Sequence, residues 1–200
     1  MQLNKPKLNS GDTLILASHN KGKIEEFKTL LKPFSLKILT SSDLNINDVE
    51  ETGKSFKENS ILKVKSIPNE YVALSDDSGL CVTSLNNQPG IYSARFSHQN
   101  GGWQNSMKII YEKIINEGGG EFEAKFFCSL SIKFPNDLIY SYNGEVFGNI
   151  VWPPRGGNGF GYDPFFIPQG GQKTFGELEH HKKIRIDHRS VALKKLIKSH

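Results

Sequence analysis

The stretch TLILASHNKGKIEEFKTLLKP, residues 13–33, contains the pattern that decides the fold. Its first five residues form a short apolar run rich in strand formers, and residues 24–31 then repeat apolar side chains along one helical face. Asn20 is placed to cap this helix, so the turn SHNKGK, residues 18–23, presents free backbone amides at the positive end of a helix dipole. The turn predicts a phosphate site, although a capped helix with solvated lysines fits the same residues equally well.

The rest of the chain alternates helical and strand patterns. The patterns predict a helix over residues 52–67, strands over 71–75 and 80–85 joined by the turn DDSG, a helix over 103–115, a hairpin of strands over 122–134 and 138–142, a loop over 152–168 and a helix over 189–198. We therefore expect one mixed α/β domain over residues 13–200. Residues 1–12 are expected to be a flexible N-terminal extension.

The composition limits the classes of function. The chain has 25 Lys and Arg against 21 Asp and Glu, a formal net charge of +4. This excess is too mild to predict a nucleic-acid-binding protein, although it suits a small anionic substrate. Cys81 and Cys128 lie in apolar stretches without CxxC spacing, which is typical of buried thiols in a reducing compartment. No signal-peptide pattern and no long apolar window is present, so we expect a cytoplasmic enzyme that does not contact a membrane.

Two pairs of acidic residues are candidates for a metal site. Glu50 and Glu51 precede one predicted helix, and Asp76 and Asp77 follow a predicted strand. Mg²⁺ prefers oxygen ligands and usually takes one or two carboxylates together with substrate phosphates. The glutamates are also typical of exposed acids at a helix start, and the aspartates are also typical of a turn. Adjacent aspartates after an apolar strand repel each other, however, unless a bound cation neutralises them. The pattern therefore favours a functional role for the aspartates.

The segment GGNGFGYDPFF, residues 156–166, combines four glycines with aromatic side chains. Glycines allow a backbone to approach a ligand closely, and Phe160 and Tyr162 offer flat apolar faces on which a purine could stack. The alternative is a glycine-rich loop whose aromatic side chains fill the core.

A second C-terminal segment, KKIRIDHRSVAL, gathers hydrogen-bond donors just before the last predicted helix. The donors belong to Lys182, Lys183, His188 and Arg189. Such a group would prefer the 6-oxo acceptor of hypoxanthine or xanthine over the 6-amino donor of adenine. A solvated basic surface is the alternative, and it is the better interpretation of Lys182.

In this order, the motifs resemble those of the inosine triphosphate pyrophosphatase family. The similar strings run from Leu14 to Leu196 and are SHNKGK, EETGKSFKENSILK, LSDDSGL, PGIYSARFS, FFCSL, FGYDPFF and DHR followed by an Ala. The resemblance implies an α/β fold with an elongated mixed β-sheet flanked by helices and two lobes around a central cleft. It also implies a homodimer.

The resemblance assigns roles to individual residues. Asp77 would be the general base or water-positioning group, with Asp76 supporting it and Lys63 assisting at the phosphates, and Glu51 and Asp77 would hold Mg²⁺. The residues implied to contact the substrate are Ser18, His19, Asn20, Lys21, Gly22, Lys23, Asn59, Ser78, Phe160, Gly161, Tyr162, Asp163, Lys183, His188 and Arg189. The implied reaction is hydrolysis of ITP, dITP or XTP to the nucleoside monophosphate and pyrophosphate, with magnesium-activated water attacking the α-phosphorus.

One residue departs from the family pattern. Asp187 stands where the family usually has Ser, and its carboxylate could compete for the donors of Arg189.

Three other functions stay open. They are a relative that acts on modified pyrimidine triphosphates, a nucleotide sensor without catalysis, and a nucleic-acid-binding module. The intact acidic pair argues against a sensor, and the nearly balanced charge argues against a nucleic-acid module.

Overall fold

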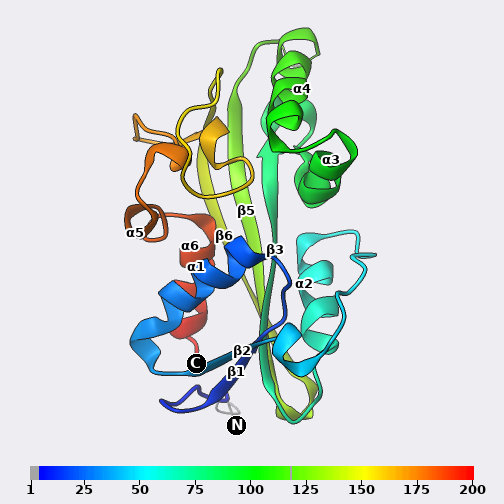
Figure 1. Ribbon diagram of the computed structural model, residues 1–200, viewed down its shortest axis with the longest axis vertical. Coiled ribbons are helices and arrows are strands. Elements are labelled where there is room, and N and C mark those ends of the chain that lie inside the picture. The colour runs from blue at the N-terminus through cyan, green and yellow to red at the C-terminus, as the bar shows by residue number, and fades with distance from the viewer. Residues whose placement is uncertain (1–4, 118) are drawn as a thin grey trace. The chain divides into compact units, whose positions relative to one another are not determined.

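The computed structural model describes residues 5–117 and 119–200, and within them seven strands form one mixed sheet (Figure 1). The strands are β1 (Thr13–Leu16), β2 (Lys37–Thr40), β3 (Val72–Val82), β4 (Gln88–Pro89), β5 (Glu123–Phe134), β6 (Leu138–Ile150) and β7 (Phe166–Pro168). Their order is β2, β1, β3, β5, β6, β7, and β4 pairs with β3. β1 is parallel to β2 and β3, whereas β4 and β7 are antiparallel to β3 and β6.

Helices flank this sheet, which confirms the predicted α/β class. In the described part of the chain they are α1 (Lys21–Leu31), α2 (Phe56–Lys65), α3 (Ser93–Gln99), α4 (Trp103–Asn116), α5 (His180–Lys183) and α6 (His188–Ile197). α2 begins later than predicted, because Ser55 caps it by accepting the N–H of Glu58 at 3.2 Å. Among the described residues, none of the helices has both the length and the apolar character needed to cross a membrane.

β3 differs from the predicted arrangement of strand, turn and strand. The DDSG residues lie inside the continuous strand and do not form a turn. Gly79 is needed here for close packing, since a Cβ at this position would collide with the carbonyl oxygen of Gly90. Because successive side chains of a strand point to opposite faces, Asp76 and Asp77 are directed to opposite faces of the sheet.

Contacts divide the chain into two compact units. Unit 1 contains the residues up to 77, residues 129–144 and the residues from 189 onward. Unit 2 contains residues 78–128 and 145–188. Each unit has its own set of packed side chains, so each offers a separate scaffold for functional groups.

The core of unit 1 forms around β1. Its residues Leu14, Ile15 and Leu16 are almost completely buried, because β1 lies between β2 and β3. Ile15 belongs to a buried cluster with Val64 of α2 and Ala73 of β3. The apolar run that the sequence predicts as a strand therefore anchors the turn that follows it.

The core of unit 2 forms around α4 and a group of aromatic residues. Met107, Ile110 and Ile114 are buried along one face of α4, which confirms the predicted apolar stripe. Ile115, which the same pattern included, is 48% exposed. Cys81 and Cys128 are both buried, as predicted, and burial raises the pKa of the Cys81 thiol to about 11.

The N-terminal segment, residues 5–12, is part of unit 1, and two of its residues contact other elements of that unit. The ammonium of Lys5 lies 5.2 Å from the ring centroid of Tyr140. The carbonyl oxygen of Pro6 lies 2.6 Å from Nδ1 of His200, the C-terminal residue. Residues 1–4, the start of the predicted extension, lie outside the described residues. Tyr140 of β6 and His200 thus contact the segment, and the flexible extension over residues 1–12 stays a prediction.

A buried lysine connects β5 to the segment that follows α2. Lys133 is fully buried, and its Nζ donates to the carbonyl oxygens of Ile67 and Pro68 and to Asn69 Oδ1. Replacing Lys133 by Met should lower the free energy of unfolding by about 1–3 kcal/mol, because the carbonyl oxygen of the buried Ile67 would lose its donor. Urea denaturation of both proteins measures this difference.

The exposed Lys65, in α2, provides the matched control. Lys65→Met makes the same chemical change at a solvated position. We expect it to change the free energy of unfolding by less than about 0.5 kcal/mol. Equal effects of the two substitutions would show that the buried contacts of Lys133 do not stabilise the fold.

Candidate active site

The turn between β1 and α1 has the capped geometry that the sequence predicts. Asn20 has an extended backbone, and its Oδ1 accepts the N–H of Lys23 at 3.1 Å. Ser18 Oγ accepts the N–H of Asn20 at 3.2 Å. These bonds order the first turn of α1, so its amides and positive dipole end are suited to bind phosphate.

The other residues of this turn differ in their surroundings. His19 Nε2 lies 3.0 Å from the carbonyl oxygen of Ile46, and its Nδ1 lies 3.3 Å from Asp48 Oδ1. Lys21 is exposed and Gly22 is half-buried at the start of α1. The contacts of His19 connect the turn to the segment after β2.

Four charged side chains, of which three are buried and Lys23 is half-buried, form a network on one face of β3. Asp76 Oδ2 lies 3.2 Å from Lys23 Nζ and 3.2 Å from Arg189 Nε. Arg189 Nη1 in turn donates to Glu26 Oε2 at 2.9 Å. Two positive and two negative groups therefore balance, which reduces the cost of burying them. Figure 1 shows α1 and α6, which carry three of the four residues, on the same side of β3.

Glu26 is a member of this network that the sequence analysis missed. A signal was present, because Glu26 follows Lys23 by three residues and lies beside Phe27, on the helical face that enters the core. Its carboxylate holds Arg189, which binds the substrate in the sequence-based prediction. Glu26 is therefore a positioning residue for Arg189.

Replacing Glu26 by Gln should lower the free energy of unfolding by about 3–5 kcal/mol, because it leaves the buried guanidinium of Arg189 without its full counter-charge. Glu25 is the matched control, since it pairs with Lys28 at 3.4 Å on the exposed face of α1. We expect Glu25→Gln to lower the free energy of unfolding by less than about 1 kcal/mol. Urea denaturation distinguishes them, and a Glu26→Gln protein as stable as Glu25→Gln would contradict a structural role for the network.

A second cluster surrounds Asp77 on the opposite face of β3. Asp77 Oδ2 accepts from Asn59 Nδ2 at 2.9 Å, and its Oδ1 lies 3.8 Å from Lys63 Nζ. The same ammonium forms an ion pair with Glu51 Oε1. Gly53 N donates to Asn59 Oδ1 at 2.8 Å and fixes the amide. Glu51 and Asp77, which are 26 positions apart in the sequence, therefore converge on one cationic group.

Burial and charge shift the protonation of these groups. Burial raises the pKa of Asp77, and the nearby Lys63 only partly opposes this change. Burial alone would lower the pKa of Lys63, but the carboxylates of Asp77 and Glu51 outweigh it and raise this pKa. Burial lowers the pKa of Lys23 despite the attraction of Asp76. A carboxylate with a raised pKa next to a retained ammonium is suited to accept a proton.

The oxygen atoms of Glu51 and Asp77 are the candidate ligands for a divalent ion. Both carboxylates contact Lys63 Nζ, so their oxygen atoms point toward the same region around this ammonium. Hard oxygen donors of this kind fit Mg²⁺, which commonly takes few protein ligands and completes its shell with water and phosphate. Over residues 5–117 and 119–200, no group of three or more His, Cys, Asp or Glu side chains is arranged to hold a metal.

In unit 2, the two C-terminal motifs meet around Lys183. Its Nζ lies 3.1 Å from Asp163 Oδ2 and 3.8 Å from Asp187 Oδ2. The same ammonium lies 5.2 Å from the ring centroid of Phe160 and 5.8 Å from that of Phe175. The lysine is buried, although the alternative of a solvated basic surface would expose it. A buried donor beside an aromatic face has the properties needed to bind a 6-oxopurine.

Tyr162, a predicted stacking residue, is a core residue. It is 2% exposed, and its ring contacts Trp103 edge-to-face at a centroid distance of 5.0 Å. Burial also raises the pKa of its hydroxyl group. The preceding Gly161 has a positive φ of 66°, which favours glycine at this turn. The buried ring of Tyr162 fits the alternative of an aromatic side chain that fills the core, and the assignment of this residue to the substrate stays a prediction.

The remaining predicted residues have distinct environments. His188 is buried and stacks on Phe126 with a centroid distance of 4.9 Å. Ser78 is half-buried in β3. Two donors of Arg189 bind Asp76 and Glu26, as described above, and Asp187 lies beside Lys183 immediately before α6. Their assignment to the substrate stays a prediction.

Comparison with known proteins identifies the relatives of this chain. The family model of the Ham1 family matches residues 14–199. A dITP/XTP pyrophosphatase of Zymomonas mobilis is 40% identical over 92% of this chain and 90% of its own length. A dITP/XTP pyrophosphatase of Gluconobacter oxydans is 38% identical over 94% and 90% of the two chains.

The solved structures agree with this result. The structure of a HAM1 protein from Coxiella burnetii superposes with a TM-score of 0.84 at 34% identity, covering 94% of this chain and 97% of that one. Sequence and fold therefore match the same group of proteins over nearly the whole chain, and the chain belongs to the Ham1 family.

Proposed function

We propose that this protein hydrolyses the deaminated purine nucleotides ITP, dITP and XTP to the nucleoside monophosphate and pyrophosphate. The observation that carries the proposal is the buried Asp77 whose carboxylate, together with that of Glu51, contacts the ammonium of Lys63. The activity named for the relatives supports the same reaction. A general base, a cation and paired oxygen ligands are the parts that this hydrolysis needs.

The proposal assigns Mg²⁺ to this protein as its cofactor, with Glu51 and Asp77 as the protein ligands. When bound, this ion supplies Lewis-acid chemistry that polarises phosphate oxygens and acidifies water. Lys63 now balances the two carboxylates, and its long flexible stem allows its ammonium to turn toward a phosphate instead. The cluster thus combines ligands for the metal with a cation for the substrate.

The phosphate groups are assigned to the N-terminus of α1 and to two lysines. The first amides of α1 offer donors, and Asn20 fixes the start of the helix. Lys23 and Lys63 are largely buried, so their charges act in a medium of low dielectric. These groups stabilise the negative charge that builds on the departing pyrophosphate.

Asp77 is assigned to the attacking water. Asn59 holds Oδ2 and leaves Oδ1 on the side of Lys63, so Oδ1 is the atom that accepts the proton. The water oxygen forms a bond to the α-phosphorus while the bond from that phosphorus to the pyrophosphate oxygen breaks. One in-line step completes the hydrolysis, and it requires no covalent intermediate.

Recognition of the base is assigned to Lys183 in unit 2, with Phe160 as the aromatic face. A 6-oxo group accepts a hydrogen bond from the ammonium, whereas the 6-amino group of adenine presents its own donors. Asp163 accepts the N–H of Phe160 at 2.9 Å and also pairs with Lys183, so it orders both groups. This arrangement supports a preference for deaminated purines.

The proposal includes a homodimer in the cytoplasm. Exposed apolar side chains such as Phe147 and Trp152, which are 56% and 37% exposed, provide surface that a second copy could cover. Sedimentation equilibrium of the full chain tests this part, and a monomer at micromolar concentration would contradict it.

The main experiment measures pyrophosphate release from a panel of nucleoside triphosphates with and without Mg²⁺. We expect release from ITP, dITP and XTP that requires the metal. A preference for modified pyrimidines would indicate the related pyrimidine activity, and ITP binding without release would indicate a sensor. Either result would overturn the proposed function.

A further inference from the structure

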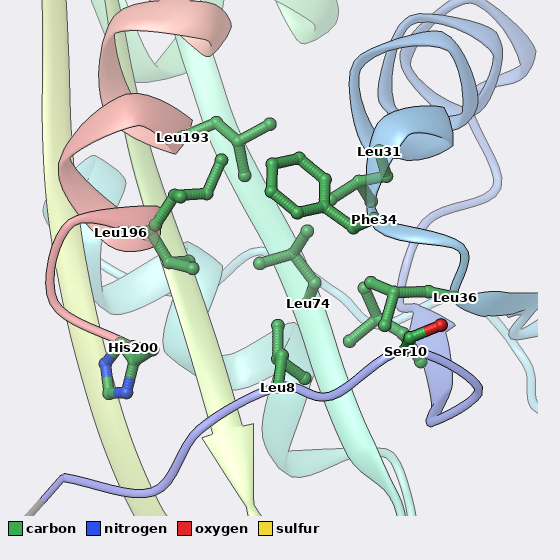
Figure 2. Close-up of a pocket in the computed structure, with 11 residues that line it drawn as sticks. Leu8, Ser10, Leu31, Phe34, Leu36, Leu74, Leu193, Leu196 and His200 are labelled. Carbon is green, nitrogen blue, oxygen red and sulfur yellow. The ribbon is translucent and has the colours of Figure 1, made fainter.

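Unit 1 contains a cavity of about 240 Å³ between α1, β3 and α6 (Figure 2). Its inner wall consists of leucines that are at most 3% exposed, namely Leu14, Leu31, Leu74, Leu193 and Leu196. Figure 2 shows Leu193 and Leu196 of α6 directed toward Leu31 and Phe34, with Leu74 of β3 between the two groups. The cavity is therefore formed by core residues and reaches the surface near Phe34, which is 37% exposed.

The lining offers few polar side chains. Among the described residues of the lining, only Ser10 and His200 have polar side-chain atoms. Both ring nitrogens of His200 already have contacts, Nδ1 with Pro6 at 2.6 Å and Nε2 with the hydroxyl of Tyr142 at 2.8 Å. A charged occupant would lose its hydration without gaining a counter-ion, so the lining selects uncharged molecules.

We propose that this cavity is a binding site for a small, uncharged, apolar ring compound. Cavities of roughly 150 Å³ lined by Leu, Ile and Phe stay free of water and bind benzene, and the cavity of unit 1 is larger and similarly lined. Burying an apolar ring against these leucines is favourable because it removes apolar surface from water. The site is separate from the residues assigned to nucleotide hydrolysis.

The position of the cavity determines how a ligand enters it and which helices a bound ligand stabilises. Leu8 and Ser10 of the N-terminal segment form one wall, and because the cavity reaches the surface near Phe34, a ligand can enter while the leucine core stays closed. The helices that supply the other walls also carry Glu26 and Arg189, whose ion pair joins α1 to α6. An occupant therefore stabilises the packing of the same two helices.

Methyl NMR of the wild-type protein with benzene tests the site directly. We expect the methyl resonances of the lining leucines to shift with saturation, while those of Leu80 and Leu85 in the core of unit 2 stay in place. Pyrimidine, which has the shape of benzene but is polar, should cause no shift. At about ten times the dissociation constant, benzene should raise Tm by about 3–6 °C.

Two variants that fill the cavity provide the control. Leu36→Phe and Leu8→Phe enlarge half-buried side chains at its rim, so each should fold and each should abolish the shifts. Lining resonances of the wild type that do not respond to benzene would overturn the proposal. Equal responses in both variants and the wild type would also overturn it, because they would place the benzene elsewhere.

Discussion

Replacing Asp77 by Asn is expected to lower kcat/KM for ITP by about 10²–10⁴-fold, the contribution of a positioned general base. Asn has the shape of Asp, and its amide oxygen can accept the hydrogen bond that Asn59 donates at 2.9 Å. It cannot take up a proton from water, and it offers one neutral oxygen to a metal where Asp offers a carboxylate. Activity should therefore fall while the fold stays intact.

Steady-state pyrophosphate release and thermal unfolding measure these two consequences. Asp137→Asn is the matched control, since Asp137 is exposed and accepts one hydrogen bond from Asn69 at 3.1 Å. It should leave both kcat/KM and Tm unchanged. Near-normal rates in the Asp77→Asn protein would show that another group activates the water.

The elements that the sequence predicts best are those whose pattern depends on local chemistry. The apolar run of β1, the cap at Asn20 and the stripe of α4 each follow from propensity, capping and periodicity. The order of the motifs predicts the family, which the relatives confirm. The convergence of Glu51 and Asp77 is different, because the sequence marked two acidic pairs as candidates for a metal site and only the resemblance selected these two residues.

The features that the sequence could not show depend on long-range packing. The acidic residues in β3 looked like a turn because Asp and Gly are common in turns, yet pairing with neighbouring strands keeps this segment extended. Glu26 looked like an ordinary helical acid because its partner Arg189 is 163 positions away. Tyr162 looked available for stacking because a glycine-rich segment does not reveal which rings enter the core.

Selectivity for deaminated purines is the second large effect that we expect. The ratio of kcat/KM for ITP to that for ATP should be about 10⁴, because a site built to hydrogen-bond one group strongly rejects an analogue that lacks it. Adenine would place its amino group, itself a donor, against the buried ammonium of Lys183, whereas a 6-oxo group would accept a hydrogen bond from it. Parallel measurements of pyrophosphate release with ITP and ATP give this ratio, and parity would contradict a donor pocket.

Substitutions at two adjacent lysines distinguish selectivity that comes from a hydrogen-bond donor from the general effect of positive charge. Lys183 is buried against Asp163 and Phe160, whereas Lys182 is exposed and pairs with Glu179 at 3.5 Å. Lys183→Met should reduce the ITP to ATP ratio by at least about 10-fold through loss of the donor, and Lys182→Met should not change it. Because the ratio compares two substrates on the same protein, partial unfolding of the Lys183 variant lowers both rates equally. A ratio that is the same in both variants and the wild type would assign recognition of the base to other donors.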